Sequence, residues 1–127
     1  IVWRKIENVK SLKEINHKAV RELLKYLKIK QGLEIHYHGD LPARSGMGSS
    51  SCFTVGLMQA LCQIKNIKLN KSKLASKSIH FEQNVMKEIV GSQDQTSASY
   101  GGFNKITFNK DNSIKIKKIS SKKILKN

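Results

Sequence analysis

The chain has 127 residues, of which 39% are hydrophobic, and it carries a formal net charge of +15 at pH 7. This length fits one domain or a piece of one, and no apolar run approaches the ~18 residues of a membrane-crossing helix, so we expect no membrane insertion. The two cysteines, Cys52 and Cys62, lie too far apart in one predicted helix to bond to each other, which favours reduced thiols and a cytoplasmic location.

Lysine carries most of the positive charge. Lys outnumbers Arg by 21 to 3, and the lysines are spread along the whole chain. Because Arg is the better bidentate ligand of phosphates and bases, this composition favours a solvated basic surface over a nucleic-acid site. We therefore expect no nucleic-acid partner, while the positive potential would steer anionic substrates inward.

Two elements are predicted before the centre of the chain. Residues 9–28 have apolar side chains at helical spacing, which predicts an amphipathic helix. After Gly32, residues 33–38 alternate in the manner of a half-buried strand. The residues expected to face inward on this strand are Leu33, Ile35 and Tyr37. His36 and His38 share its other face, where the lack of a third ligand nearby favours an exposed polar surface over a metal site.

The central part of the sequence predicts a loop and two helices. Residues 42–50 form a loop rich in Gly and Ser, and a helix follows over 50–65. Gly56 inside this helix indicates close packing against another backbone. The buried candidates on this helix are Val55, Met58, Leu61 and Cys62. A third helix is predicted over 71–90, with Asn70 as its N-cap. The apolar stripe of this third helix comprises Leu74, Ser78, Phe81, Val85 and Ile89.

The last part of the sequence predicts one more helix and a hairpin. A short polar helix over 92–99 is closed by two glycines at 101–102. Residues 103–108 and 113–119 alternate and predict two strands, joined by a turn at 110–112. The last eight residues are basic, and we expect them to be frayed.

The Gly/Ser loop before the second helix is the first feature that indicates chemistry. Small residues at a helix N-terminus leave backbone N–H groups open to a phosphate. The residues expected to contact a nucleotide phosphate are Gly46, Met47, Gly48, Ser49, Ser50 and Ser51. No Lys follows the glycines as it does in a Walker A loop, so the design is a different one. Considered alone, the three serines are explained equally well as helix N-caps.

Two carboxylates follow this loop along the chain. Glu82 lies about thirty residues after the serines, and Asp94 lies twelve residues after Glu82. Each has a structural explanation by itself, Glu82 as a helix boundary residue and Asp94 as a helix cap. Phosphoryl transfer, however, needs a phosphate cradle, oxygen ligands for Mg²⁺ and a group that orients the attacking hydroxyl. The loop, Ser50 with Glu82, and Asp94 are candidates for these three roles in that order.

The order and spacing of these residues resemble the GHMP small-molecule kinases. The signature loop of that family, Pro-x-x-x-Gly-Leu-Gly-Ser-Ser, matches Pro42 through Ser50, with Met47 in place of Leu. The resemblance implies that the chain uses ATP, that Ser50 and Glu82 hold Mg²⁺, and that Asp94 is the catalytic group. It also implies an α+β fold of the ribosomal protein S5 domain 2-like type, in which helices pack on a mostly antiparallel sheet.

Within this family, several strings are similar to the D-glycero-D-manno-heptose 7-phosphate kinase branch. They lie at 40–44, 49–57, 79–82, 90–95 and 100–104. The resemblance implies ATP-dependent phosphorylation of the anomeric hydroxyl of a heptose 7-phosphate, a step of carbohydrate metabolism. Arg44 is a further candidate for a phosphate contact, with a surface Arg as the alternative.

We expect the chain to be a fragment of such a kinase. Residues 1–127 correspond to a partial N-terminal domain, without the first family motif and without the C-terminal domain that carries the third. This predicts an incomplete sheet whose open edge invites self-association, and little or no catalysis by the chain alone. Two alternatives stay open: another GHMP sugar kinase, of the fucose or galactose type, and a non-catalytic basic binding module.

Overall fold

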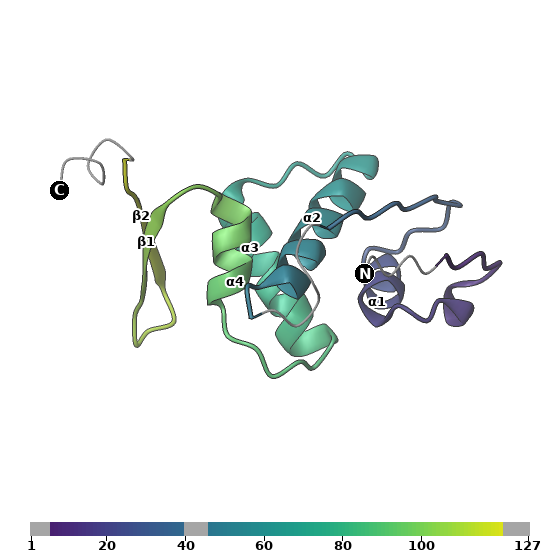
Figure 1. Cartoon of the computed structure of the whole chain (residues 1–127), viewed down its shortest axis with the longest axis horizontal. Helices are drawn as coiled ribbons and strands as arrows, with labels where there is room; N and C mark the ends of the chain where they lie inside the picture. Colours follow the sequence, from purple (N-terminus) through teal and green to yellow (C-terminus); the bar gives the residue numbers. More distant parts are fainter. Residues whose placement is uncertain (1–5, 40–45, 121–127) are drawn as a thin grey trace.

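The computed structural model describes residues 6–39 and 46–120. Its elements in chain order are η1 (Leu12–Glu14), α1 (Lys18–Tyr26), α2 (Ser49–Ile64), α3 (Lys71–His80), η2 (Phe81–Val85), α4 (Gln93–Tyr100), β1 (Asn104–Phe108) and β2 (Ile114–Lys118). The helices form the body of the molecule, with α1 toward one end and the β1–β2 hairpin at the other, beyond α4 (Figure 1). The fold therefore mixes helices with a small sheet.

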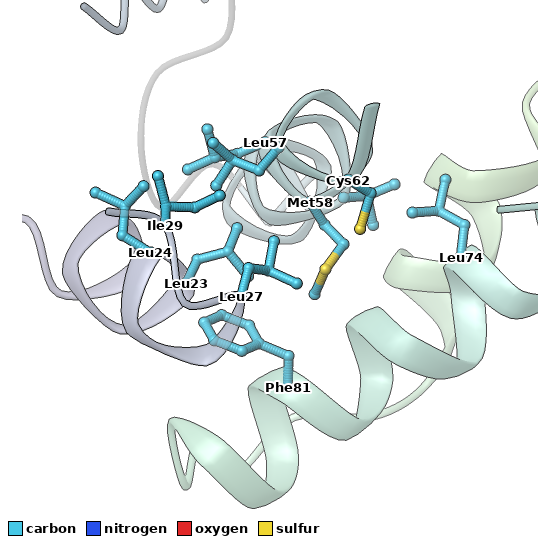
Figure 2. Close-up of a cluster of buried hydrophobic side chains, with 11 residues drawn as sticks. Leu23, Leu24, Leu27, Ile29, Leu57, Met58, Cys62, Leu74 and Phe81 are labelled. Atoms are coloured by element: carbon cyan, nitrogen blue, oxygen red, sulfur yellow. The ribbon is translucent and has the colours of Figure 1, made fainter. Parts of the chain in front are cut away.

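The hydrophobic core lies between α1, α2 and the continuous α3–η2 segment (Figure 2). Leu23, Met58 and Phe81 are fully buried and come from these three parts of the chain. The Tyr26 ring packs against Phe81, with ring centroids 5.6 Å apart. Burial of these side chains removes apolar surface from water and is the main force that holds α2 against α3.

Helix α2 confirms the prediction over 50–65 to within one residue at each end. Its predicted core positions, Val55, Met58, Leu61 and Cys62, are all buried. Gly56 does not have the predicted role, because a Cβ at this position would meet no atom within 4 Å. Instead, Gly56 lines an apolar groove of about 360 Å³ between α2 and residues 33–37. By helical periodicity, this groove follows the face of α2 opposite Ser51.

The predicted helix over 9–28 is shorter and interrupted. Helix α1 begins only at Lys18, where the ring of the N-cap His17 accepts the N–H of Val20 at 3.4 Å. The preceding segment is held by Arg21, whose guanidinium donates to the Ile15 carbonyl at 2.6 Å. Ile15 still packs on the core, so the apolar spacing marked the buried face correctly but not the helical length.

The predicted strand over 33–38 is wrong. These residues form no regular element, and Ile35 and Tyr37, which were expected to face inward, are exposed. A strand requires a hydrogen-bonded neighbour, and in the part of the chain that the structure describes only β1 and β2 pair. The segment instead lies along α2, where the Tyr37 ring contacts Phe53 edge-on with centroids 4.8 Å apart.

Helix α3 begins as predicted and ends early. The Asn70 side chain accepts the N–H of Lys73 at 2.8 Å, which confirms the N-cap. The helix then widens into the π turn η2, which ends at Val85 rather than near residue 90. Lys87 has a φ of 55°, which breaks the helical path. Ile89, predicted to lie on the apolar stripe, is therefore fully exposed.

The C-terminal elements match their predictions closely. Helix α4 ends before Gly101 and Gly102, whose φ angles of 62° and 75° favour glycine. Strands β1 and β2 pair antiparallel, with Ile106 opposite Ile116 and Lys105 opposite Lys117. Of the last eight residues, which were predicted to be frayed, 121–127 lie outside the described residues. Within residues 6–39 and 46–120, none of the helices combines the length and apolar character that a bilayer crossing requires.

Candidate functional site

The phosphate-type loop ends at the N-terminus of α2. Gly46 and Gly48 have φ angles of 74° and 70°, a conformation that favours glycine. Gly48 is the N-cap and has no side chain to cap the helix. The first helical hydrogen bond runs from the Cys52 N–H to the Gly48 carbonyl at 2.9 Å. The N–H groups of 49–51 come before it and take no part in the hydrogen bonds within the helix. Such donors at a positive helix end suit an anion.

Asp94 lies directly against this loop. A Cβ placed on Gly48 would be 3.0 Å from the carboxyl carbon of Asp94 and 3.1 Å from its Oδ2. Asp94 belongs to the first turn of α4 and is exposed to solvent. The tertiary structure therefore brings the predicted catalytic carboxylate and the predicted phosphate loop together, although they are more than forty positions apart in the sequence.

Glu82 lies behind the loop in a buried polar cluster. Its side chain comes from η2, and the residue is only 4% exposed. The Ser51 hydroxyl donates to Oε2 of Glu82 at 2.9 Å, and the Gln95 Nε2 donates to the same oxygen. Gln95 is 1% exposed, and its own Oε1 is buried and has no hydrogen-bond partner among the described residues.

The path of the chain between the two carboxylates explains how they reach one site. Glu82 lies in the π turn η2, which directly follows α3. Such turns are often found at functional sites. The neighbouring Gln83 donates from Nε2 to the Val90 carbonyl at 3.0 Å, which ties η2 to the segment that leads into α4. Helix α4 itself packs on α2 and α3, so Asp94 and Gln95 enter the site on consecutive positions of one helix.

Among the described residues, Glu82 offers one carboxylate, but no complete ligand set, to a divalent cation. In the described part of the chain, no Lys, Arg or His forms an ion pair with this buried carboxylate, and both of its hydrogen-bond donors are neutral. A buried carboxylate without an ion pair is costly, and a bound cation would offset this cost. No group of three or more His, Cys, Asp or Glu that could hold a metal occurs among these residues, so other ligands would complete such a site.

The structure places two neighbouring serines in different surroundings. The hydroxyl that contacts Glu82 is that of Ser51, whereas Ser50 is exposed and its hydroxyl makes no hydrogen bond within the described residues. Ser50 as a metal ligand stays a prediction. Arg44, the other candidate for a phosphate contact, lies outside the described residues, as does Pro42.

Sequence reasoning missed the part that Gln95 plays in this cluster. Gln95 follows Asp94 in the motif at 91–95, and the sequence pattern predicts a role only for the Asp94 carboxylate. A glutamine on the inward face of a short helix is a signal, because a buried amide requires a hydrogen-bond partner. The partner here is Glu82.

Comparisons with known proteins match the chain to one family. The sequence profile described as the GHMP kinases N terminal domain matches residues 14–102. The chain is also 30% identical over 96 residues to a D-glycero-alpha-D-manno-heptose 7-phosphate kinase of Campylobacter jejuni. That alignment covers 76% of this chain but only 27% of the relative. No solved structure gives a significant match to the chain.

Proposed function

This chain belongs to the GHMP kinase family, and on that premise we propose that it provides the ATP-phosphate and catalytic region of a sugar kinase. The acceptor in this proposal is the anomeric hydroxyl of D-glycero-D-manno-heptose 7-phosphate. The proposal concerns the whole protein, because the chain spans about a quarter of the relative that it matches. The complete domain would have the ribosomal protein S5 domain 2-like fold, with strands added to those described.

The contact between Asp94 and Gly48 is the observation that supports kinase chemistry most. A phosphate bound to the amides of the loop would lie beside the Asp94 carboxylate, because a Cβ on Gly48 would be 3.0 Å from its carboxyl carbon. Transfer requires a phosphate and a proton acceptor at the same place. A role limited to helix capping would not require Asp94 to lie against a loop of another helix.

Each group then has a defined task. The N–H groups of 46–51 hold the transferring phosphate, which they stabilise through direct hydrogen bonds and the positive end of α2. Asp94 accepts the proton of the sugar hydroxyl. The hydroxyl oxygen of the sugar bonds to the terminal phosphorus of ATP as the bond from that phosphorus to the ADP oxygen breaks. Ser50 and Glu82 would hold Mg²⁺, which supplies positive charge to the phosphates when bound.

The assignment of the sugar substrate rests on the similar relative rather than on the residues of the site. The heptose assignment follows from the similar strings and from the name of the Campylobacter jejuni protein. A fucose or galactose kinase of the same family would use the same phosphate loop and carboxylates. A panel of sugars and sugar phosphates, assayed with ATP and Mg²⁺ on the full-length protein, distinguishes these substrates.

The decisive experiment measures ADP release by the full-length protein that contains this chain. We expect turnover with heptose 7-phosphate that requires Mg²⁺, and little or no turnover by residues 1–127 alone. Formation of the 1-phosphate, followed by phosphorus NMR, identifies the anomeric position. Absence of transfer to every sugar in the panel, together with salt-dependent binding of a polyanion, would instead favour the basic binding module.

A further inference from the structure

We propose that Ser51 and Gln95 are positioning residues that together fix the Glu82 carboxylate for binding of the cation that accompanies ATP. The proposal rests on the kinase function proposed above and adds two residues to it. It assigns Ser51 to the support of Glu82 and leaves Ser50 as the hydroxyl that faces the nucleotide side. It also explains why a glutamine is buried next to the catalytic carboxylate.

Both donors reach the same oxygen of Glu82. Ser51 Oγ lies 2.9 Å from Oε2, and Gln95 Nε2 donates to Oε2 as well, whereas no donor in the described part of the chain reaches Oε1. One oxygen is therefore held from two helices, and the other is left for a further ligand. Hydrogen bonds of this kind to a metal-binding carboxylate commonly fix its orientation.

The neutrality of the two donors matters for the charge at the site. A Lys or Arg on Glu82 would hold the carboxylate equally well but would cancel the charge that attracts a cation. Ser51 and Gln95 orient Glu82 without this cancellation. No cationic side chain of the described residues forms an ion pair with Glu82.

The buried amide of Gln95 supports a specific role over simple packing. Its Oε1 is buried without a hydrogen-bond partner among the described residues, which is unfavourable. An apolar side chain of similar size would fill the same space without this cost. The bond from Nε2 to Glu82 is the only side-chain hydrogen bond that Gln95 makes in the described part of the chain, and it offsets the cost.

Helix geometry agrees with the division between the two serines. Successive residues of an α-helix point about 100° apart, so the two neighbouring hydroxyls leave the helix in different directions. Ser51 takes the inward direction and is buried, whereas Ser50 is exposed at the helix N-terminus. Ser51 thus acts through Glu82, and Ser50 is left free to contact a cation or phosphate directly.

The test measures cation binding rather than catalysis. Mn²⁺ replaces Mg²⁺ as the probe, and its dissociation constant is measured by the electron paramagnetic resonance signal of free Mn²⁺. The sample is the full-length protein with a non-hydrolysable ATP analogue. We expect Ser51→Ala and Gln95→Leu each to weaken Mn²⁺ binding about tenfold or more. Ser51→Ala removes only one oxygen atom, so it remains informative if Gln95→Leu does not fold.

Matched controls are available on α4. Thr96→Val and Ser99→Ala also remove buried hydroxyls, but these donate to the backbone carbonyls of Ser92 and Gln95 rather than to Glu82. We expect both controls to keep the parental Mn²⁺ affinity. In a Glu82→Gln background, we expect Ser51→Ala to cause no further loss, because its effect acts through the Glu82 carboxylate.

The outcomes separate the two proposals. If the parent binds Mn²⁺ and Glu82→Gln does not, but Ser51→Ala and Gln95→Leu bind it as the parent does, the positioning role is wrong and the kinase proposal stands. An equal loss in Thr96→Val or Ser99→Ala would also overturn the positioning role, because the effect would then be structural. If the parent itself binds no Mn²⁺ in the presence of the nucleotide analogue, the proposed function fails.

Discussion

The Asp94 carboxylate lies so close to Gly48 that a single added carbon on the glycine would be 3.0 Å from the Asp94 carboxyl carbon. This contact joins α4 to the N-terminus of α2. A side chain at position 48 would crowd the Asp94 carboxylate, independently of the φ angle of 70° that also favours glycine there. Gly48 therefore has two reasons to be glycine, and Gly46 has only the second.

The two glycines allow a direct test of this contact. Gly46→Ala and Gly48→Ala both force alanine into a left-handed conformation, at about 1–2 kcal/mol each. Gly48→Ala must also displace Asp94, because the added Cβ would be 3.0 Å from the Asp94 carboxyl carbon. The added Cβ of Gly46→Ala would meet no atom within 4 Å. We expect kcat of the full-length kinase to fall about tenfold or more below that of Gly46→Ala. Equal kcat values for the two variants would contradict a catalytic contact at Gly48.

Asp94→Asn tests the proton acceptor. The amide keeps the size of the side chain but cannot take the hydroxyl proton, so we expect kcat to fall about 10²- to 10⁴-fold, with an unchanged melting temperature. Asp111→Asn is the matched control, because Asp111 lies in the hairpin turn and accepts hydrogen bonds from Ser113 there. Steady-state kinetics and thermal denaturation measure both effects. An unchanged rate in Asp94→Asn would remove Asp94 from the mechanism.

Phe81→Ala tests the core that holds the site. Phe81 is fully buried beside Leu23 and Met58, one position before Glu82. Its removal leaves a cavity, and we expect the free energy of unfolding to fall by about 3–5 kcal/mol. Ile89→Ala is the control, because Ile89 is fully exposed and should change stability by less than about 0.5 kcal/mol. Urea denaturation measures both, and a large loss in Ile89→Ala would contradict the early end of α3–η2.

The two thiols should differ in reactivity. Burial raises the pKa of the Cys62 thiol, against a smaller opposite effect of nearby lysines, whereas Cys52 is exposed. A raised pKa leaves less reactive thiolate at neutral pH, so iodoacetamide should label Cys52 first in the folded protein. The raised pKa of Cys62 also stabilises the fold below the unfolded thiol pKa, and this contribution is lost as pH rises through the folded pKa. Peptide mass spectrometry at increasing pH measures both sites, and equal labelling rates would contradict the burial.

The β1–β2 hairpin contains a like-charge cross-strand pair, and one substitution can change it into a pair of opposite charges. Lys105 lies directly opposite Lys117, an arrangement that destabilises a two-stranded sheet. Lys117→Glu should therefore stabilise the hairpin by about 0.2–1 kcal/mol, and the gain should shrink as salt screens the pair. Lys110→Glu, in the turn outside the strand register, controls for the change in net charge. Hydrogen exchange of the strand amides measures the effect, and an equal gain in Lys110→Glu would assign it to net charge.

Local patterns in the sequence were sufficient for the elements whose signals are local. Helix α2, the start of α3 at Asn70, α4 and the antiparallel hairpin all lie within a few residues of their predicted positions. Each is specified by short-range spacing, a capping side chain or a glycine at the end. The strand at 33–38 failed because strand formation depends on a partner, which a pattern of alternation does not supply.

The sequence by itself also determined the family, because the loop at 42–50, Glu82 and Asp94 form a pattern in order and spacing. Only the tertiary structure decided which atoms meet. The packing of α4 on α2 placed Asp94 against Gly48, and the π turn placed Glu82 between Ser51 and Gln95. Spacing along a chain fixes which side chains share a helix face, whereas contacts between helices depend on how their apolar faces pack. For this reason the sequence named the carboxylates, and the fold identified the serine and the glutamine that hold one of them.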